Sequence, residues 1–208
     1  MEKKLLIFDL DGTLFDTDFS CQEEIFRRHF GSNQSMDVYK DIGEILGEYE
    51  KKFLTYDFSK LSDYLTSKTG VYVPEEFIHE WNDVLYKNNL KLNDGVISTL
   101  DYLRDKGYFL RFLTNWFSEC QLKRLQDANI IDYFDLILCG EQTTKPNKES
   151  YYLAAQGFDP NDCLVIGDDL ERDFLGPKTA GFDAILFDKT NKSGYRCINK
   201  FDDLKRRF

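Results

Sequence analysis

Basic residues are in the minority in this chain, and this shortage limits what the protein can bind. The 208 residues include 27 Lys and Arg against 37 Asp and Glu, which gives a formal net charge of -10. So acidic a chain is poorly suited to nonspecific binding of nucleic acid or of an anionic membrane surface. A small anion held locally by lysine and by backbone N–H groups remains compatible with this charge.

Cysteines are few and show no pairing pattern. The five cysteines, at positions 21, 120, 139, 163 and 197, are odd in number and include no C-x-x-C pair. This argues against a disulfide framework or a zinc site and favours a reducing, cytoplasmic location. The chain start carries several charges and lacks a long apolar segment, so we expect neither a signal peptide nor a membrane span. We also find no internal repeat and no low-complexity tract.

What the sequence does contain is a regular alternation of strand and helix patterns. Short apolar runs typical of buried strands occur at 5–8, 108–114, 134–139, 163–167 and 182–187. From residue 94 onward, amphipathic helices are predicted between these runs, which indicates an α/β fold with a parallel sheet and helices on both faces. In one of these helices, Ser118 and Gln121 form a capping-box pattern.

Residues 18–90 have a different sequence pattern, because they show helical periodicity and no convincing strand. Helices are predicted around 19–30 and within 37–54, 58–70 and 74–86. We therefore expect a core formed by 1–17 and 91–208, with a four-helix unit, 18–90, inserted after the first strand. The polar stretches on either side of the insertion could act as hinges.

The stretch "LLIFDLDGTLFDT" places two carboxylates directly after a buried strand. Asp9 and Asp11 lie two positions apart, so their side chains project to the same side of the chain. Two like charges so close repel and are costly to desolvate, and a Mg²⁺ ion would relieve this conflict. Gly12 lets the backbone approach a ligand or turn tightly. The simpler alternative is an Asp-Gly turn with both carboxylates in solvent.

Polar residues also follow the other predicted strands. Ligands of open α/β sheets bind beyond the carboxyl ends of the strands, so these residues should meet at one edge. Taken singly, each has a simpler explanation, such as a turn, a solvated lysine or a helix cap. Together they gather a hydroxyl, a lysine and several carboxylates at that edge: Thr114, Asn115, Lys145, Asp168, Asp169 and Asp173.

Four stretches, in this order, resemble motifs of the haloacid dehalogenase-like superfamily, most of whose members are phosphatases. They are "FDLDGTLFDT", "FLTN", "TKPNKESYYLA" and "VIGDDLERDFLGPKTAGF". The resemblance implies a Rossmann-like, doubly wound parallel sheet core, and the insertion resembles the helical C1 cap of the phosphatase branch. It also implies a Mg²⁺-dependent phosphatase acting on a small phosphomonoester such as a sugar phosphate or nucleotide.

The resemblance further implies the roles of the main site residues. Asp9 would be the nucleophile that becomes an aspartyl phosphate, and Asp11 the general acid and later the base. Thr114 would hydrogen-bond the phosphoryl oxygens, and Lys145 would hold the phosphate and neutralise Asp9. Mg²⁺ would be held by Asp9, by the backbone carbonyl of Asp11 and by Asp168.

Four further positions would support these groups. Gly12 and Asn115 would contact the phosphate, and Asp173 would orient Lys145 or the water molecules on the metal. Asp169 stands where the family often has Ser, so it is either an extra ligand or a supporting group.

Rival functions share much of this set of residues. A phosphomutase of the same superfamily would use the same nucleophile, and a phosphate-binding relative would use the site without catalysis. A response-regulator receiver is disfavoured, since its phosphorylated Asp follows a middle strand and it has no large helical insertion. Asp11 favours phosphate chemistry over dehalogenation, which needs no acid. Lys148, where relatives often carry Pro, is expected on an outer helix face, and Trp116 is expected to be a core aromatic. The identity of the substrate stays open.

Overall fold

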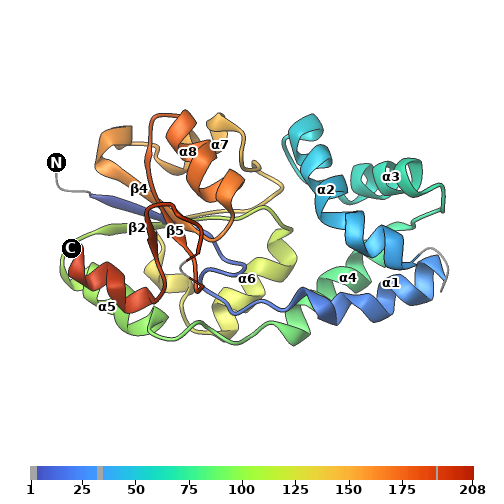
Figure 1. The fold of residues 1–208 in the computed structure, drawn as a ribbon, viewed down its shortest axis with the longest axis horizontal. Helices are drawn as coiled ribbons and strands as arrows, with labels where there is room; N and C mark the ends of the chain where they lie inside the picture. The colour runs from blue at the N-terminus through green and yellow to red at the C-terminus, as the bar shows by residue number, and fades with distance from the viewer. Residues whose placement is uncertain (1–3, 32–34, 191) are drawn as a thin grey trace.

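A six-stranded, wholly parallel sheet forms the centre of the computed structural model, which describes residues 4–31, 35–190 and 192–208 (Figure 1). The strand order is β3-β2-β1-β4-β5-β6. The predicted α/β class with a parallel sheet is confirmed. The strands are β1 (Leu5–Phe8), β2 (Phe109–Leu113), β3 (Leu136–Leu138), β4 (Cys163–Gly167), β5 (Asp183–Phe187) and β6 (Cys197–Ile198).

The first strand shows why this sheet is covered on both faces. All four residues of β1 are fully buried, and alternate side chains point to opposite faces. Leu6 and Phe8 join one apolar cluster, whereas Leu5 and Ile7 join another. The unbroken apolar run therefore reflects two buried faces, as expected for a parallel sheet.

Helices cover each face of the sheet. The face that carries Leu6 and Phe8 packs against α5 (Val96–Asp105), α6 (Ser118–Asp127) and the 3₁₀ helix η5 (Phe201–Arg206). The opposite face packs against α7 (Lys148–Ala154), the π-helical turn η4 (Leu170–Leu175) and α8 (Gly176–Thr179). Two further 3₁₀ turns, η2 (Ile131–Tyr133) and η3 (Pro160–Asp162), precede β3 and β4.

Between β1 and α5 the chain forms a separate helical layer, at the right of Figure 1. It consists of η1 (Phe19–Gln22), α1 (Glu23–Phe30), α2 (Ser35–Phe53), α3 (Phe58–Thr69) and α4 (Glu75–Asn88). These helices share their own apolar cluster, which Trp116, Phe117 and Cys120 from the sheet-bearing part complete. Within the described part of the chain, no helix has both the length and the hydropathy needed to cross a bilayer.

The chain enters and leaves the helical layer through two segments that run together. The backbone N–H of Asp16 donates to the carbonyl of Lys91 at 2.8 Å, and Phe15 forms a bridge with Leu92. The predicted boundaries at 17/18 and 90/91 fall on this pair of segments. The division into two domains stays a prediction.

The predicted capping box at the start of α6 is wrong. The helix is N-capped at Phe117, and the backbone N–H of Ser118 donates instead to the carboxylate of Glu141 at 2.9 Å. Glu141 comes from a neighbouring loop, so a tertiary contact supplies the acceptor that a local motif would have supplied. The Gln121 side chain, free of that task, turns toward Asp11.

The strand order reverses between β1 and β4, because β2 and β3 lie on one side of β1 while β5 and β6 lie beyond β4. The carboxyl ends of strands at such a switch point diverge and leave a crevice, which is where ligands bind in open α/β sheets. The residues that follow β1 and β4 therefore lie at this crevice.

Candidate active site

Asp9 and Asp168 lie at this crevice because β1 and β4 are neighbours in register. Phe8 pairs with Ile166, and the backbone N–H of Asp9 donates to the carbonyl of Ile166 at 3.0 Å. Asp9 is buried, whereas Asp168 is exposed toward the cavity described below. The pairing brings together two carboxylates that are 159 positions apart in the chain (168 − 9).

Lys145 is the cation at the centre of the site. It lies in the loop between β3 and α7 and is only 2% exposed. Its Nζ lies 2.6 Å from Asp9 Oδ1 and 2.6 Å from Asp173 Oδ1. Burial acts to lower the pKa of Lys145, but the two carboxylates outweigh burial and raise it. The lysine is therefore charged at any physiological pH.

Asn115 fixes the loop that carries this lysine. Its Nδ2 donates to the carbonyl of Lys145 at 2.6 Å, and its Oδ1 accepts from the backbone N–H of Lys145 at 2.7 Å. Both polar ends of the Asn115 amide thus hold the backbone of Lys145. The predicted contact between Asn115 and a phosphate stays a prediction. Thr114, the preceding residue, is buried and lines the cavity.

Three carboxylates crowd around this lysine. Ligand oxygens of Asp9, Asp168 and Asp173 all lie within 4.8 Å of one another. Burial, with the neighbouring acids, raises the pKa of Asp9 from 3.8 to about 7 and that of Asp168 from 3.8 to about 8. One lysine does not neutralise three acids, so the cluster is suited to a divalent cation with oxygen ligands, such as Mg²⁺.

Asp173 is the least available of the three as a metal ligand. Its Oδ1 accepts from Lys145, and its Oδ2 accepts from the backbone N–H of Asp169 at 3.1 Å. Asp9 and Asp168 keep more free acceptor capacity, although Asp168 Oδ1 also accepts from the Thr13 hydroxyl at 3.2 Å. Of the two roles predicted for Asp173, orienting Lys145 or orienting the water molecules on the metal, the structure shows a contact with Lys145. The division of roles among the three carboxylates stays a prediction.

Gly12 makes room for Asp168. Its φ of +73° lies in the left-handed region, and a Cβ atom there would stand 2.1 Å from Asp168 Oδ2. Any side chain would strain the backbone and displace the carboxylate. Glycine is therefore required by the position of Asp168.

Asp11 is held by donors that sequence reasoning did not identify. Its Oδ1 accepts from Arg124 Nη1 at 2.6 Å and from the Thr17 hydroxyl at 2.8 Å, and its Oδ2 accepts from Gln121 Nε2 at 2.8 Å. Burial acts to raise the pKa of Asp11, but the charge and hydrogen bond of Arg124 outweigh it and lower the pKa. A signal was available: Gln121 and Arg124 are polar residues on the buried face of α6.

Arg124 also links Asp11 to both segments that connect the helical layer to the sheet. The guanidinium is 1% exposed; Nη2 donates to the Thr17 hydroxyl at 3.0 Å, and Nε donates to the carbonyl of Asn89 at 2.8 Å. Thr17 lies on the incoming segment and Asn89 on the outgoing one. Any shift of these two segments would therefore change the contacts of Arg124, which holds Asp11.

Arg172 and Glu50 form a second unpredicted link between the two layers. Arg172 Nε and Nη2 lie 2.9 and 2.8 Å from Glu50 Oε2 at the end of α2, and Nη1 lies 2.8 Å from Asp169 Oδ2. Asp169 also accepts from two backbone N–H groups at the start of η4, so it caps this helix, as the simpler interpretation predicted.

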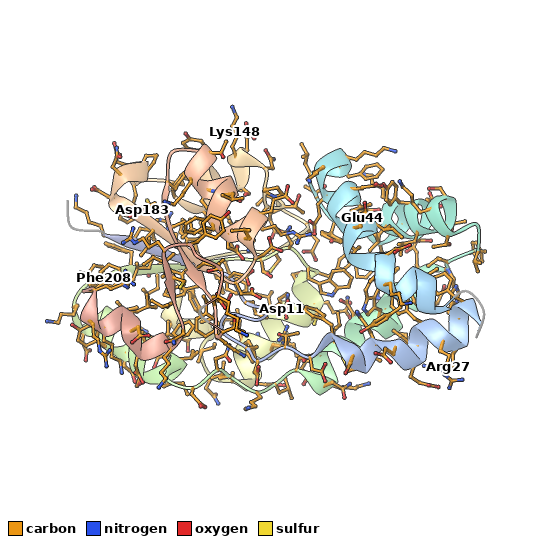
Figure 2. All side chains as sticks on the ribbon, in the orientation of Figure 1. Asp11, Arg27, Glu44, Lys148, Asp183 and Phe208 are labelled. Carbon is orange, nitrogen blue, oxygen red and sulfur yellow. The ribbon has the colours of Figure 1, made fainter. Side chains whose placement is uncertain are left out.

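A cavity of about 530 Å³ joins these groups to the helical layer. Asp9, Thr114, Lys145 and Asp168 line one end, and side chains of η1, α2 and α4 line the other. Figure 2 shows Asp11 between the sheet and the helical layer and Lys148 at the top of the sheet-bearing part, on its outer side. The Lys148 side chain is 70% exposed, as the prediction of an outer face requires.

Comparisons with known proteins identify the family and the fold. A family model described as haloacid dehalogenase-like hydrolase matches residues 6–187. The phosphorylated carbohydrates phosphatase of Thermotoga maritima is 27% identical over 186 residues, which cover 86% of this chain and 82% of that protein. The ribulose-1,5-bisphosphate 5-phosphatase of Halopiger xanaduensis is 30% identical over 112 residues, 52% of this chain and about half (47%) of that protein. A magnesium-bound crystal structure of the HAD-hydrolase YfnB from Bacillus subtilis has the same fold, with a TM-score of 0.78 and 24% identity over 100% of this chain and 99% of that one.

The raised pKa values of Asp9 and Asp168 predict a pH-dependent stability in the presence of a chelator. Both groups have an ordinary pKa of 3.8, against about 7 and about 8 in the folded protein. Between these values the folded state binds more protons than the unfolded state, so stability present below about pH 4 is lost progressively as pH rises and is fully lost above about pH 8. We expect the melting temperature in EDTA to fall between pH 5 and 8 and to level off above that, and Mg²⁺ to raise it more at pH 8 than at pH 5.

Asp168→Asn is the matched control, because it removes one of the two titrating groups. Its melting temperature in EDTA should fall less steeply over the same pH range. An equal pH slope in the variant and the wild type, or a Mg²⁺ effect that does not depend on pH, would contradict the assignment.

Proposed function

Because the chain belongs to the haloacid dehalogenase-like hydrolases, we propose that it is a Mg²⁺-dependent phosphatase that hydrolyses a small phosphomonoester through an aspartyl phosphate on Asp9. The observation that carries the proposal is the position of Lys145, which bridges Asp9 and Asp173 next to Asp168. A cation so placed lets one anion approach another, which is the main difficulty of phosphoryl transfer.

The first step forms a bond between a carboxylate oxygen of Asp9 and phosphorus and breaks the bond between phosphorus and the alcohol oxygen. Asp11 donates a proton to that departing oxygen. Because the contact with Arg124 lowers the pKa of Asp11, Asp11 has to leave that contact and take up a proton before this step. Thr114 donates its hydroxyl hydrogen to a phosphoryl oxygen, while Lys145 stabilises the negative charge on the phosphoryl group. When bound between Asp9 and Asp168, with the carbonyl of Asp11, Mg²⁺ would add charge neutralisation at the phosphoryl oxygens.

The second step returns Asp9 to its starting form. Asp11, now a carboxylate, takes a proton from a water molecule, whose oxygen attacks phosphorus and breaks the bond to Asp9. Asp11 must turn toward the substrate for both steps. In the structure its two oxygens accept from Arg124, Thr17 and Gln121, so at least one of these hydrogen bonds has to break.

In this proposal residues 18–90 act as a cap over the core formed by 1–17 and 91–208. The cavity between the two layers holds the alcohol part of the substrate, and the phosphate lies at the Asp9 end. The sizes and chemistry of sugar phosphates and nucleotides are both compatible with a cavity of about 530 Å³. We retain a cytoplasmic location as part of the proposal.

The direct test is turnover of a phosphomonoester panel in ¹⁸O-labelled water, with Mg²⁺ and with EDTA. We expect Mg²⁺-dependent release of one phosphate per alcohol, with the label in the free phosphate, because water is the acceptor. An isomerised sugar phosphate without free phosphate would indicate the phosphomutase instead. Failure of the whole panel would refute the phosphatase proposal.

Asp9→Asn should abolish turnover, because an amide oxygen cannot replace the attacking carboxylate. A loss of roughly a thousand-fold or more in kcat is expected when a nucleophile is removed. Steady-state kinetics and mass spectrometry of the phosphorylated enzyme are the measurements, and Asp63→Asn on the exposed face of α3 is the control. A near-normal kcat in a homogeneous Asp9→Asn sample would contradict the proposed mechanism.

Asp11→Asn should slow the first step in proportion to the need for a proton on the leaving oxygen. General acid catalysis contributes about 10²–10⁴-fold, so alkyl phosphates should lose that much, whereas p-nitrophenyl phosphate, whose phenolate leaves unaided, should lose far less. Single-turnover release of the alcohol isolates this step from the later attack of water. An equal loss for both leaving groups would show that Asp11 is not the acid.

A further inference from the structure

The end of the cavity at the helical layer, called the cap end here, is largely apolar. Its walls come from η1, α2 and α4 and from the loop after β2, and they are mainly aromatic and aliphatic: Phe19, Tyr39, Leu46, Trp81, Leu85 and Trp116. The rings of Trp81 and Trp116 meet with a centroid distance of 4.9 Å and form one corner. The alcohol part of the substrate would lie against these side chains.

The polar groups in this wall are largely paired with one another. The indole Nε1 of Trp81 donates to Gln22 Oε1, and the Tyr39 hydroxyl donates to the carbonyl of Phe19 at 3.2 Å. Glu50, at the boundary with the core, accepts from Tyr56 and from Arg172. Two groups of the described wall have no hydrogen-bond partner: the buried indole Nε1 of Trp116 and the exposed ammonium of Lys40 at the rim. The wall therefore offers a ligand few hydrogen bonds.

Because the polar groups of the wall are largely paired with one another, the wall favours one kind of substrate alcohol over another. A polyol buried against the wall would lose water from several hydroxyl groups and gain few partners, which is unfavourable for each unpaired group. A flat, largely apolar ring would lose little water and would gain contact with the aromatic side chains.

On the basis of the proposed phosphatase function, we propose that the preferred substrate is a phosphomonoester whose alcohol carries a planar heterocyclic ring, rather than the phosphate of a simple polyol. The ring lies in the pocket formed by the cap residues, and the phosphate lies beside Asp9 and Lys145.

Gly43 lies on the wall of this pocket and borders open space. It lies within α2, lines the cavity, and an added Cβ would meet no heavy atom within 4 Å beyond its own chain neighbours and helix backbone. A glycine in the middle of a helix destabilises it relative to alanine, so its presence on the cavity side is consistent with a need for space.

The first experiment compares wild-type kcat/KM for uridine 5′-monophosphate and ribose 5-phosphate. The first compound carries a uracil base at the sugar carbon where the second carries a hydroxyl group. Pyridoxal 5′-phosphate is added as a ring without ribose, and glycerol 3-phosphate as a small polyol. We expect both ring-bearing substrates to exceed both polyol phosphates by about tenfold or more, as stacking of one base on an aromatic group supplies. Preference for uridine 5′-monophosphate alone would narrow the class to nucleotides, and preference for pyridoxal 5′-phosphate alone to non-nucleoside rings.

The second experiment fills the pocket. Gly43→Trp should lower kcat/KM for uridine 5′-monophosphate at least about tenfold more than for glycerol 3-phosphate, because the new indole occupies the space of the ring. Glu44→Trp, on the same helix but outside the cavity lining, should change neither value (Figure 2 labels Glu44). Far-UV circular dichroism and thermal melting establish that both variants fold.

The outcomes separate this inference from the proposed function. If no phosphomonoester is turned over, the phosphatase proposal fails. If polyol phosphates are hydrolysed as well as or better than ring-bearing ones, the phosphatase stands and the ring pocket is wrong. An equal loss for both substrates in Gly43→Trp would also overturn the ring pocket, and the wild-type comparison remains decisive if that variant does not fold.

Discussion

The site depends on one electrostatic constraint: three carboxylates surround one buried lysine, which contacts two of them. Asp9, Asp168 and Asp173 come from different points of the chain, and the parallel pairing of β1 with β4 brings the first two together. Lys145 bridges two of them, which leaves excess negative charge facing the cavity. Burial, together with this excess, raises the pKa values of Asp9 and Asp168 and makes the site suitable for Mg²⁺. In the proposed function, the phosphate lies beside the lysine.

Two arginines extend this electrostatic network into the helical layer. Arg124 holds Asp11 and contacts both connecting segments, while Arg172 joins Glu50 of α2 to Asp169 of the core. Each arginine thus neutralises an acid next to the site and, at the same time, sets where the helical layer lies. If the helical layer moved relative to the sheet, these buried contacts would have to be exchanged, and the contact that holds Asp11 is one of them.

Sequence reasoning predicted the elements well where the cause is local. The apolar run at Leu5–Phe8 and the helical periodicities of α2, α3 and α4 each reflect which faces are buried. It failed at the start of α6, because Glu141 from another loop takes the place of a local cap. It also missed the two-residue strand β6 and the π-helical form of η4, since neither has a periodicity of its own.

The sequence by itself determined the α/β fold and the chemical identity of the groups at the strand ends, because strand ends can be located from apolar runs and parallel strands present them at one edge. Only the tertiary structure decided how these groups are used. Three contacts illustrate this: Asn115 holds the backbone of Lys145, Arg124 holds Asp11, and Asp169 accepts from Arg172. Each depends on side-chain directions and on contacts between distant segments. Such contacts leave no periodic trace in the chain, since any residue on a buried face is compatible with them until its neighbours are known.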